Sequence, residues 1–149
     1  MHEPALEGAR ILVIGGEDVD ASASALAERL RGDGYDGTLA RAPSQALAAC
    51  REIGQDLIVL DLDAPAPGGV VLLEQLLPFT RAGTHVPVIG LASNARPELR
   101  ERAFELGAKD LLSRPPVHEE LALHVRALLE TRHLQLCLLY TSPSPRDRS

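Results

Sequence analysis

Short runs of apolar residues, separated by segments with helical spacing, constrain the fold of this sequence more than any other feature. The clearest runs are Ile11 to Ile14, Leu57 to Leu60, Val86 to Ala92 and Leu111 to Leu112, and a weaker run covers Thr38 to Ala40. Runs that are continuously apolar, without alternating polar residues, are typical of strands covered on both faces, as in a parallel sheet. We therefore predict a five-stranded parallel sheet.

The segments between and after these runs place apolar residues at helical spacing, near residues 23–30, 46–53, 70–77, 97–106 and 117–128. We expect Ser44 to cap the second of these helices and Pro78 to end the third. Alternating strands and helices predict a doubly wound α/β fold, which is a three-layer α/β/α sandwich. Ligands of such folds bind at the carboxyl ends of the strands, near the point where the strand order reverses.

The composition excludes several functional classes. The chain has 149 residues, enough for one ordinary domain, and a formal net charge of -6. This charge, with no cluster of Lys or Arg, argues against direct nucleic-acid binding. The N-terminal segment MHEPALEGAR carries acids and no apolar stretch, so it does not read as a signal peptide, and no window has the length of a membrane span. We expect a cytoplasmic protein.

The C-terminal segment has a different origin from the rest of the chain in our interpretation. Its letters CLLYTSPSPRD, residues 137 to 147, match a reading frame of the transposase adapter used in sequencing libraries, whose codons begin TGT CTC TTA TAC ACA TCT. We expect residues 137–149 to be an artefact of sequence assembly, and the natural chain to continue beyond Leu136. Cys50 is then the one natural thiol, and a disulfide is not expected. A natural Ser/Pro-rich disordered tail is the alternative.

Acidic residues follow the third apolar run, in DLIVLDLDAPAPGG, where Asp61 ends the run and Asp63 lies just beyond. This segment, together with VPVIGLAS and ELGAKDLLSRPP in the same order and spacing, resembles the receiver domain of two-component response regulators over residues 8 to 130. The resemblance implies a flavodoxin-like fold. It places Asp61 at the phosphoacceptor position and Pro65 and Gly69 in the loop that follows.

The resemblance also implies a set of partners for Asp61. An aspartyl nucleophile and a phosphoryl group are both anionic, so Mg²⁺ is needed to neutralise their oxygens. In the family, Mg²⁺ is held by an acidic pair after the first strand, by the acceptor, and by the backbone carbonyl two residues beyond it, here that of Asp63. A lysine before a proline, here Pro115 and often in a cis bond, binds the phosphoryl group. A Thr or Ser hydroxyl contacts the same group, and an aromatic residue on the fifth strand completes the switch.

This sequence departs from the family pattern at each of these partner positions. The acidic pair, the hydroxyl, the lysine and the aromatic residue are replaced respectively by Gly15 and Gly16, Ala92, Arg114 and Leu111. Arginine keeps the positive charge of lysine but presents a planar fork. Because each lost electrostatic partner costs a few kcal/mol at a transition state, we expect slow phosphotransfer to Asp61 and weak Mg²⁺ binding.

Several residues have two interpretations. Glu17, Asp18 and Asp20 either flank and cap the first helix or reach back to a metal, and the first is favoured about two to one. Asp63 is either a solvated loop residue or an additional metal ligand. The weak Mg²⁺ candidates are therefore Asp61, Asp63 and Glu17.

Two further alternatives concern neighbouring residues. Ser93 either caps the fourth helix together with Asn94 or substitutes for the missing hydroxyl. Asp61 is either a retained acceptor or only a buried partner of Arg114. Nucleotide binding at Gly15-Gly16 has little support, because the spacing is not that of a dinucleotide-binding turn.

We predict a receiver module of a bacterial phosphorelay protein, not an enzyme, with weak or no phosphorylation at Asp61 and a role in protein contacts. Its expected partners are a histidine kinase or another signalling protein and a second copy of the chain. Residues 131–136 are expected to begin a helical linker to an output module. The alternative is a receiver that takes phosphate from a histidine kinase onto Asp61 with Mg²⁺.

Overall fold

A computed structural model describes residues 6–15, 22–63, 68–80, 85–94 and 96–141. Its five strands form one parallel sheet in the order β2-β1-β3-β4-β5, so the predicted doubly wound, flavodoxin-like fold is confirmed. The strands are β1 (Arg10–Ile14), β2 (Asp36–Ala40), β3 (Leu57–Asp61), β4 (Val88–Ala92) and β5 (Ala108–Ser113). The helices are α1 (Ser22–Gly32), α2 (Pro43–Glu52), α3 (Gly69–Gln75), α4 (Leu77–Thr80), α5 (Pro97–Glu105) and α6 (His118–Thr141).

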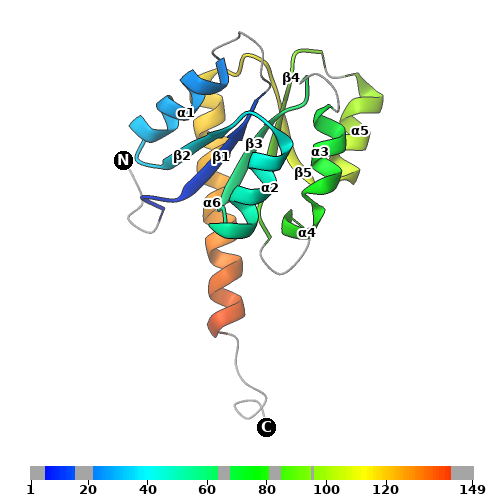
Figure 1. Cartoon of the computed structure of the whole chain (residues 1–149). Coiled ribbons are helices and arrows are strands. Elements are labelled where there is room, and N and C mark those ends of the chain that lie inside the picture. Colours follow the sequence, from blue (N-terminus) through cyan, green and yellow to red (C-terminus); the bar gives the residue numbers. More distant parts are fainter. Residues whose placement is uncertain (1–5, 16–21, 64–67, 81–84, 95, 142–149) are drawn as a thin grey trace.

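The helices cover the two faces of the sheet, as Figure 1 shows. On one face, α1 and α6 pack against alternate residues of the strands, such as Val13 and Val59. On the other face, α2, α3 and α5 pack against the residues in between, such as Ile14 and Leu60. This two-sided burial explains why β1 and β3 are continuously apolar.

The expected start of α2 is wrong in one respect. The helix begins at Pro43 after Ala42, and no side chain caps it, so Ser44 is not the cap. Proline suits the first turn of a helix because it lacks the amide hydrogen that would have no partner there, and its φ angle already matches the helix.

The expected end of the third helix also differs in detail. The helix ends at Gln75, before Pro78, but the chain continues with the short helix α4, which contains Pro78 in its first turn. Proline is disfavoured in the middle of a helix but fits its first turn. Pro78 therefore prevents α3 from continuing and is accommodated at the start of α4.

Polar contacts at two points along helix α6 anchor it to the rest of the domain. In its second turn, Nδ1 of His124 lies 2.8 Å from Oδ2 of Asp110 on β5. Further along, Arg132 donates from Nη1 to Oδ1 of Asp56 at 2.6 Å, and the other oxygen of Asp56 accepts the Arg10 N–H at 2.8 Å. The helix continues through residues 131–136 and beyond the sheet, as Figure 1 shows. Within the described ranges, no helix is long and apolar enough to cross a membrane.

The two thiols of the chain are expected to react at very different rates. Cys50 is buried on α2 and burial raises the pKa of its thiol from 9.0 to about 11, whereas Cys137 is exposed. At pH 8 the thiolate of Cys50 is therefore about a hundredfold scarcer than that of an ordinary thiol, in addition to being shielded. We predict that an alkylating reagent modifies Cys137 first and Cys50 only in denaturant, as peptide mass mapping would show. Equal rates for both thiols in the folded protein would contradict this burial.

Candidate functional site

The candidate site lies where the strand order reverses, between the carboxyl ends of β1 and β3. Gly15 follows β1 directly, Asp61 is the last residue of β3, and these two strands are neighbours in the sheet. The ends of β4 and β5 bring Ser93 and Arg114 to the same edge. Asp61, Asp63, Ser93 and Arg114 are thus brought together by topology alone, at the edge where parallel α/β sheets bind ligands.

Asp61 lies in a largely enclosed position and contacts both Arg114 and Asp63. Its side chain is 14% exposed, and its Oδ2 lies 3.5 Å from Nε of Arg114. Its Oδ1 accepts the N–H of Asp63 at 2.9 Å. The pairing of Asp61 with Arg114, which the sequence offered as the alternative to a retained acceptor, is present, and both oxygens of this carboxylate face donors.

Asp63 points into the site and binds Ser93. Its Oδ2 accepts the Ser93 N–H at 2.8 Å and the Ser93 hydroxyl at 2.7 Å. The same oxygen lies 3.7 Å from Nη1 of Arg114. Asp63 is an exposed residue, as a loop residue would be, but its carboxylate also has three donors near one oxygen, from Ser93 and Arg114.

The prediction that Ser93 and Asn94 cap the helix after β4, which is α5, is also wrong. The residue at the N-cap of α5 is Arg96, and no side chain caps that helix. The Ser93 hydroxyl instead donates to Asp63, one residue beyond the position at which Ala92 replaces the family's hydroxyl. Ser93 therefore joins the site from the end of β4 through its bonds to Asp63. Its role as a substitute for the missing hydroxyl stays a prediction.

Gly15 is closed off by helix α1. A Cβ atom added to Gly15 would lie 2.6 Å from Cβ of Ala23, closer than two such atoms approach in proteins. A carboxylate side chain at position 15 would begin with that Cβ, so α1 occupies the space that an acidic residue would need. Gly16, Glu17, Asp18 and Asp20 lie outside the described residues.

The other replaced positions are apolar in the structure. Ala92 is 3% exposed and presents only a methyl group. Leu111 on β5 directs Cδ1 to within 3.0 Å of where a Cβ of Gly90 would lie, so it fills space over the sheet. Gly69, the first residue of α3, allows that helix to approach the backbone of Asp61 and Leu62. Pro65 is outside the described residues.

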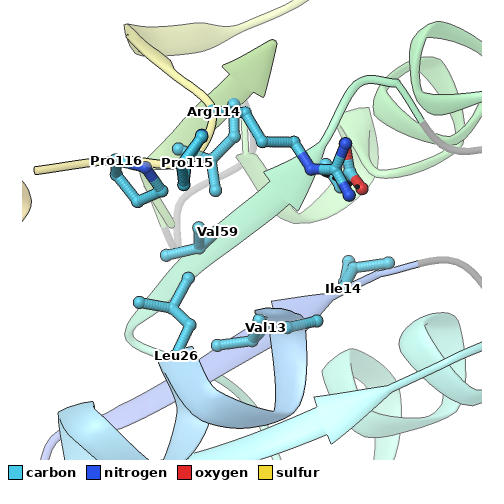
Figure 2. A pocket seen from close by; sticks show the side chains of 10 residues that line it. Val13, Ile14, Leu26, Val59, Arg114, Pro115 and Pro116 are labelled. Carbon is cyan, nitrogen blue, oxygen red and sulfur yellow. Dashed lines mark ion pairs between the residues drawn. The ribbon is translucent and has the colours of Figure 1, made fainter. Parts of the chain in front are cut away.

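A small cavity of about 40 Å³ adjoins Asp61 and Arg114. Figure 2 shows Arg114, Pro115 and Pro116 on one side of it and Val13, Val59 and Leu26 on the other. The Arg114–Pro115 peptide bond is cis, as the resemblance implied. Pockets for organic ligands have volumes of about 300–1,000 Å³, so this cavity suits a few water molecules and not a cofactor.

The described residues do not fit Mg²⁺. Mg²⁺ takes an octahedral set of oxygen ligands at about 2.0–2.1 Å, usually with carboxylates that are free to coordinate it. Here the side-chain carboxylates at the site are those of Asp61 and Asp63, and each faces the Arg114 guanidinium. No group of three or more metal-binding side chains occurs in the part of the chain that the structure describes.

Comparison with known proteins is consistent with this geometry. A family model described as the response regulator receiver domain matches residues 11–126. The chain is 36% identical over 120 residues to the DNA-binding response regulator MtrA of Mycolicibacterium smegmatis, which covers 80% of this chain and 50% of MtrA. It is 34% identical over 113 residues to the sensory transduction protein RegX3 of the same species, which covers 76% of this chain and 48% of RegX3. The chain thus spans about half the length of these curated relatives.

A solved structure shows the same fold. The CheY-like response regulator receiver domain protein from Methanospirillum hungatei matches with a TM-score of 0.75 at 22% identity, over 85% of this chain and 98% of that one. At this level of identity, the likeness concerns the fold alone.

The close approach of α1 to Gly15 predicts a specific coupling between two residues. We expect Gly15→Ala to destabilise the protein by about 1–3 kcal/mol, because its Cβ overlaps that of Ala23. Ala23→Gly alone should cost less than about 1 kcal/mol, the penalty of a helix-interior glycine, because Ala23 lies in the first turn of α1. The double variant should be more stable than the sum of the two predicts, because the overlap is gone. Urea unfolding of the four proteins measures this, and strict additivity would show that α1 does not close this position.

The contact between Asp63 and Ser93 predicts a local change in amide exchange. Asp63→Ala removes the acceptor of both Ser93 bonds, so exchange of the Ser93 amide hydrogen should accelerate by about fivefold or more. Asp36→Ala is the matched control, since Asp36 is an exposed aspartate at the start of β2. Hydrogen exchange followed by NMR distinguishes the two. Equal acceleration in both variants would contradict the Asp63–Ser93 contact.

Proposed function

The chain belongs to the response regulator receiver domain family, and from this premise we propose that it is an atypical receiver with weak or no phosphorylation of Asp61. Receiver domains of response regulators act in two-component signalling, and members of this family are in general not enzymes. In this proposal the chain signals through protein contacts whose state is not controlled by an aspartyl phosphate.

One observation carries this proposal: the acceptor carboxylate is already engaged by the protein itself. Oδ2 of Asp61 faces the Arg114 guanidinium at 3.5 Å and Oδ1 accepts an amide hydrogen at 2.9 Å. A nucleophilic carboxylate has to present a free oxygen to an incoming phosphoryl group, and another cation has to neutralise that group. The contacts of Asp61 leave neither of its oxygens free for attack. The glycine at position 15 removes a carboxylate that would help to hold the neutralising cation.

The partners that we propose are proteins. A histidine kinase or another signalling protein would contact the receiver surface, and a second copy of the chain is a further candidate. Because the relatives are about twice as long as the matched region, we propose that residues 131–136 lead into an output module in the full-length protein. DNA binding belongs to the name of the relative MtrA and, in this proposal, would reside in such a module and not in the acidic receiver.

The second candidate function is a receiver that does take phosphate onto Asp61. It is favoured by the position of Asp61 at the end of β3 and by Arg114, whose charge can bind phosphoryl oxygens after the ion pair opens. In this case Mg²⁺ would be held by Asp61 and Asp63, with Glu17 or Asp18 from the loop after Gly16.

A phosphoryl-transfer assay separates the two candidates. We predict that the chain forms no adduct with a small phosphodonor, and shows no Mg²⁺-dependent spectral change with beryllofluoride, at millimolar donor and metal. Intact mass and fluorescence or NMR spectra are the measurements, and Asp61→Asn is the control. A stoichiometric adduct that needs both Asp61 and Mg²⁺ would overturn the proposal in favour of the second candidate.

A further inference from the structure

We propose that the guanidinium of Arg114 is a built-in cation of this site, which takes the place of a divalent cation between the carboxylates of Asp61 and Asp63. The inference deepens the proposed function and rests on it, because it names the group that makes the site insensitive to Mg²⁺. It concerns the resting state of the site, and not the transfer of a phosphoryl group.

The position of Arg114 allows one side chain to serve two carboxylates. Its Nε lies 3.5 Å from Oδ2 of Asp61, and its Nη1 lies 3.7 Å from Oδ2 of Asp63. The planar fork of a guanidinium places separate N–H donors toward two acceptors, whereas an ammonium is a single compact charge. The change from the family's lysine to arginine therefore provides the geometry that a bridging cation needs.

Partial enclosure makes this bridge stronger than an ion pair on the surface. The side chains of Asp61, Arg114 and Asp63 are 14%, 23% and 26% exposed. Charges that are shielded from water to this extent interact more strongly than fully exposed ones, for which an ion pair contributes little. The two carboxylates would repel each other without a cation between them, so the guanidinium stabilises the arrangement of both.

Neutral donors provide further hydrogen bonds to the two carboxylates of the site. Asp61 accepts the Asp63 N–H, and Asp63 accepts the N–H and the hydroxyl of Ser93. Hydrogen bonds to an ionised carboxylate are stronger than those between neutral groups. A Mg²⁺ ion entering between the two carboxylates would have to displace the guanidinium and compete with these donors, so the structure opposes its binding with several contacts at once.

The same contacts tie three strand ends together. Asp61 is the last residue of β3 and Asp63 lies just beyond it, Ser93 follows β4, and Arg114 follows β5. The bridge from Arg114 and the bonds from Ser93 therefore hold the edge of the sheet in one arrangement. In this inference the arrangement is the constitutive state of the receiver, and neither a metal nor a phosphoryl group is needed to form it.

A titration with Mg²⁺ on the 149-residue chain and two of its variants tests the built-in cation. The wild type should show no saturable binding at millimolar Mg²⁺ in isothermal calorimetry or in the NMR shifts of the Asp63 and Ser93 amides. Arg114→Met removes the bridge and should bind Mg²⁺ at least about tenfold more tightly than the control Arg100→Met. Arg100 is an exposed arginine on α5, so the control makes the same change in net charge.

Two outcomes would overturn the inference. One is saturable Mg²⁺ binding by the wild type that shifts the Ser93 amide. The other is equal Mg²⁺ affinity of the Arg114→Met and Arg100→Met variants. If Arg114→Met does not fold, as circular dichroism would show, Arg114→Lys provides the comparison. A lysine reaches one carboxylate at a time, so this variant should bind Mg²⁺ more tightly than Arg100→Lys, and equal affinities would again overturn the inference.

The failure of this inference is distinguishable from that of the proposed function. A wild-type chain that binds Mg²⁺ but forms no adduct at Asp61 contradicts the built-in cation and leaves the atypical receiver intact. A chain that forms an Asp61 adduct without binding Mg²⁺ in its resting state contradicts the atypical receiver and leaves the built-in cation intact.

Discussion

A parallel sheet that is buried on both faces directs polar chemistry to the ends of its strands, and this constraint organises the whole molecule. The interiors of β1, β3 and β4 are apolar because helices cover them on both sides. Polar and charged side chains then gather at the carboxyl edge, where Asp61, Ser93 and Arg114 meet. An unpaired charge in this partly enclosed region would be costly, so each acid found there has donors around it.

The balance of charge at this edge explains why the replacements form a consistent set. A site built around a bound cation needs several carboxylates, and their mutual repulsion is relieved when the cation arrives. The described site has fewer carboxylates and a permanent positive side chain. Arg114 carries the same charge as the lysine of the family pattern, so loss of the acidic pair leaves the site with less negative charge. The single guanidinium then faces the two carboxylates that remain.

The fold could be predicted from the sequence because its signal is repeated. Apolar runs such as Ile11 to Ile14 and Leu57 to Leu60 each report the same two-sided burial, so an error in one run does not change the architecture. The placement of Asp61 and Arg114 at one edge of the sheet could be predicted because each lies at a strand end, whereas the acceptor role of Asp61 comes from the family resemblance and stays a prediction. The helix starts were predicted less well. Ser44 and Ser93 both looked like caps, since serine is favoured there, but Pro43 begins one helix and Asp63 binds the other serine.

The contacts that no sequence pattern showed are those between distant loops. Asp63 and Ser93 are thirty residues apart in the chain and meet only because β3 and β4 are neighbours in the sheet. The overlap between Gly15 and Ala23 depends on the distance between α1 and β1, which is a matter of a few tenths of an ångström. A pattern of residue types contains no such distance.

Helix α6 has a mechanical consequence for any protein joined to its end. It is a single helix of 24 residues, about 36 Å long, that begins next to the Arg114–Pro116 segment and continues past the opposite edge of the sheet. The pairs His124–Asp110 and Arg132–Asp56 fix the helix against the rest of the domain at two points along its length. Its far end is thereby given a fixed direction and a fixed rotational phase relative to the sheet. The orientation of a module that continues from this helix would therefore be set by the position of the helix on the sheet.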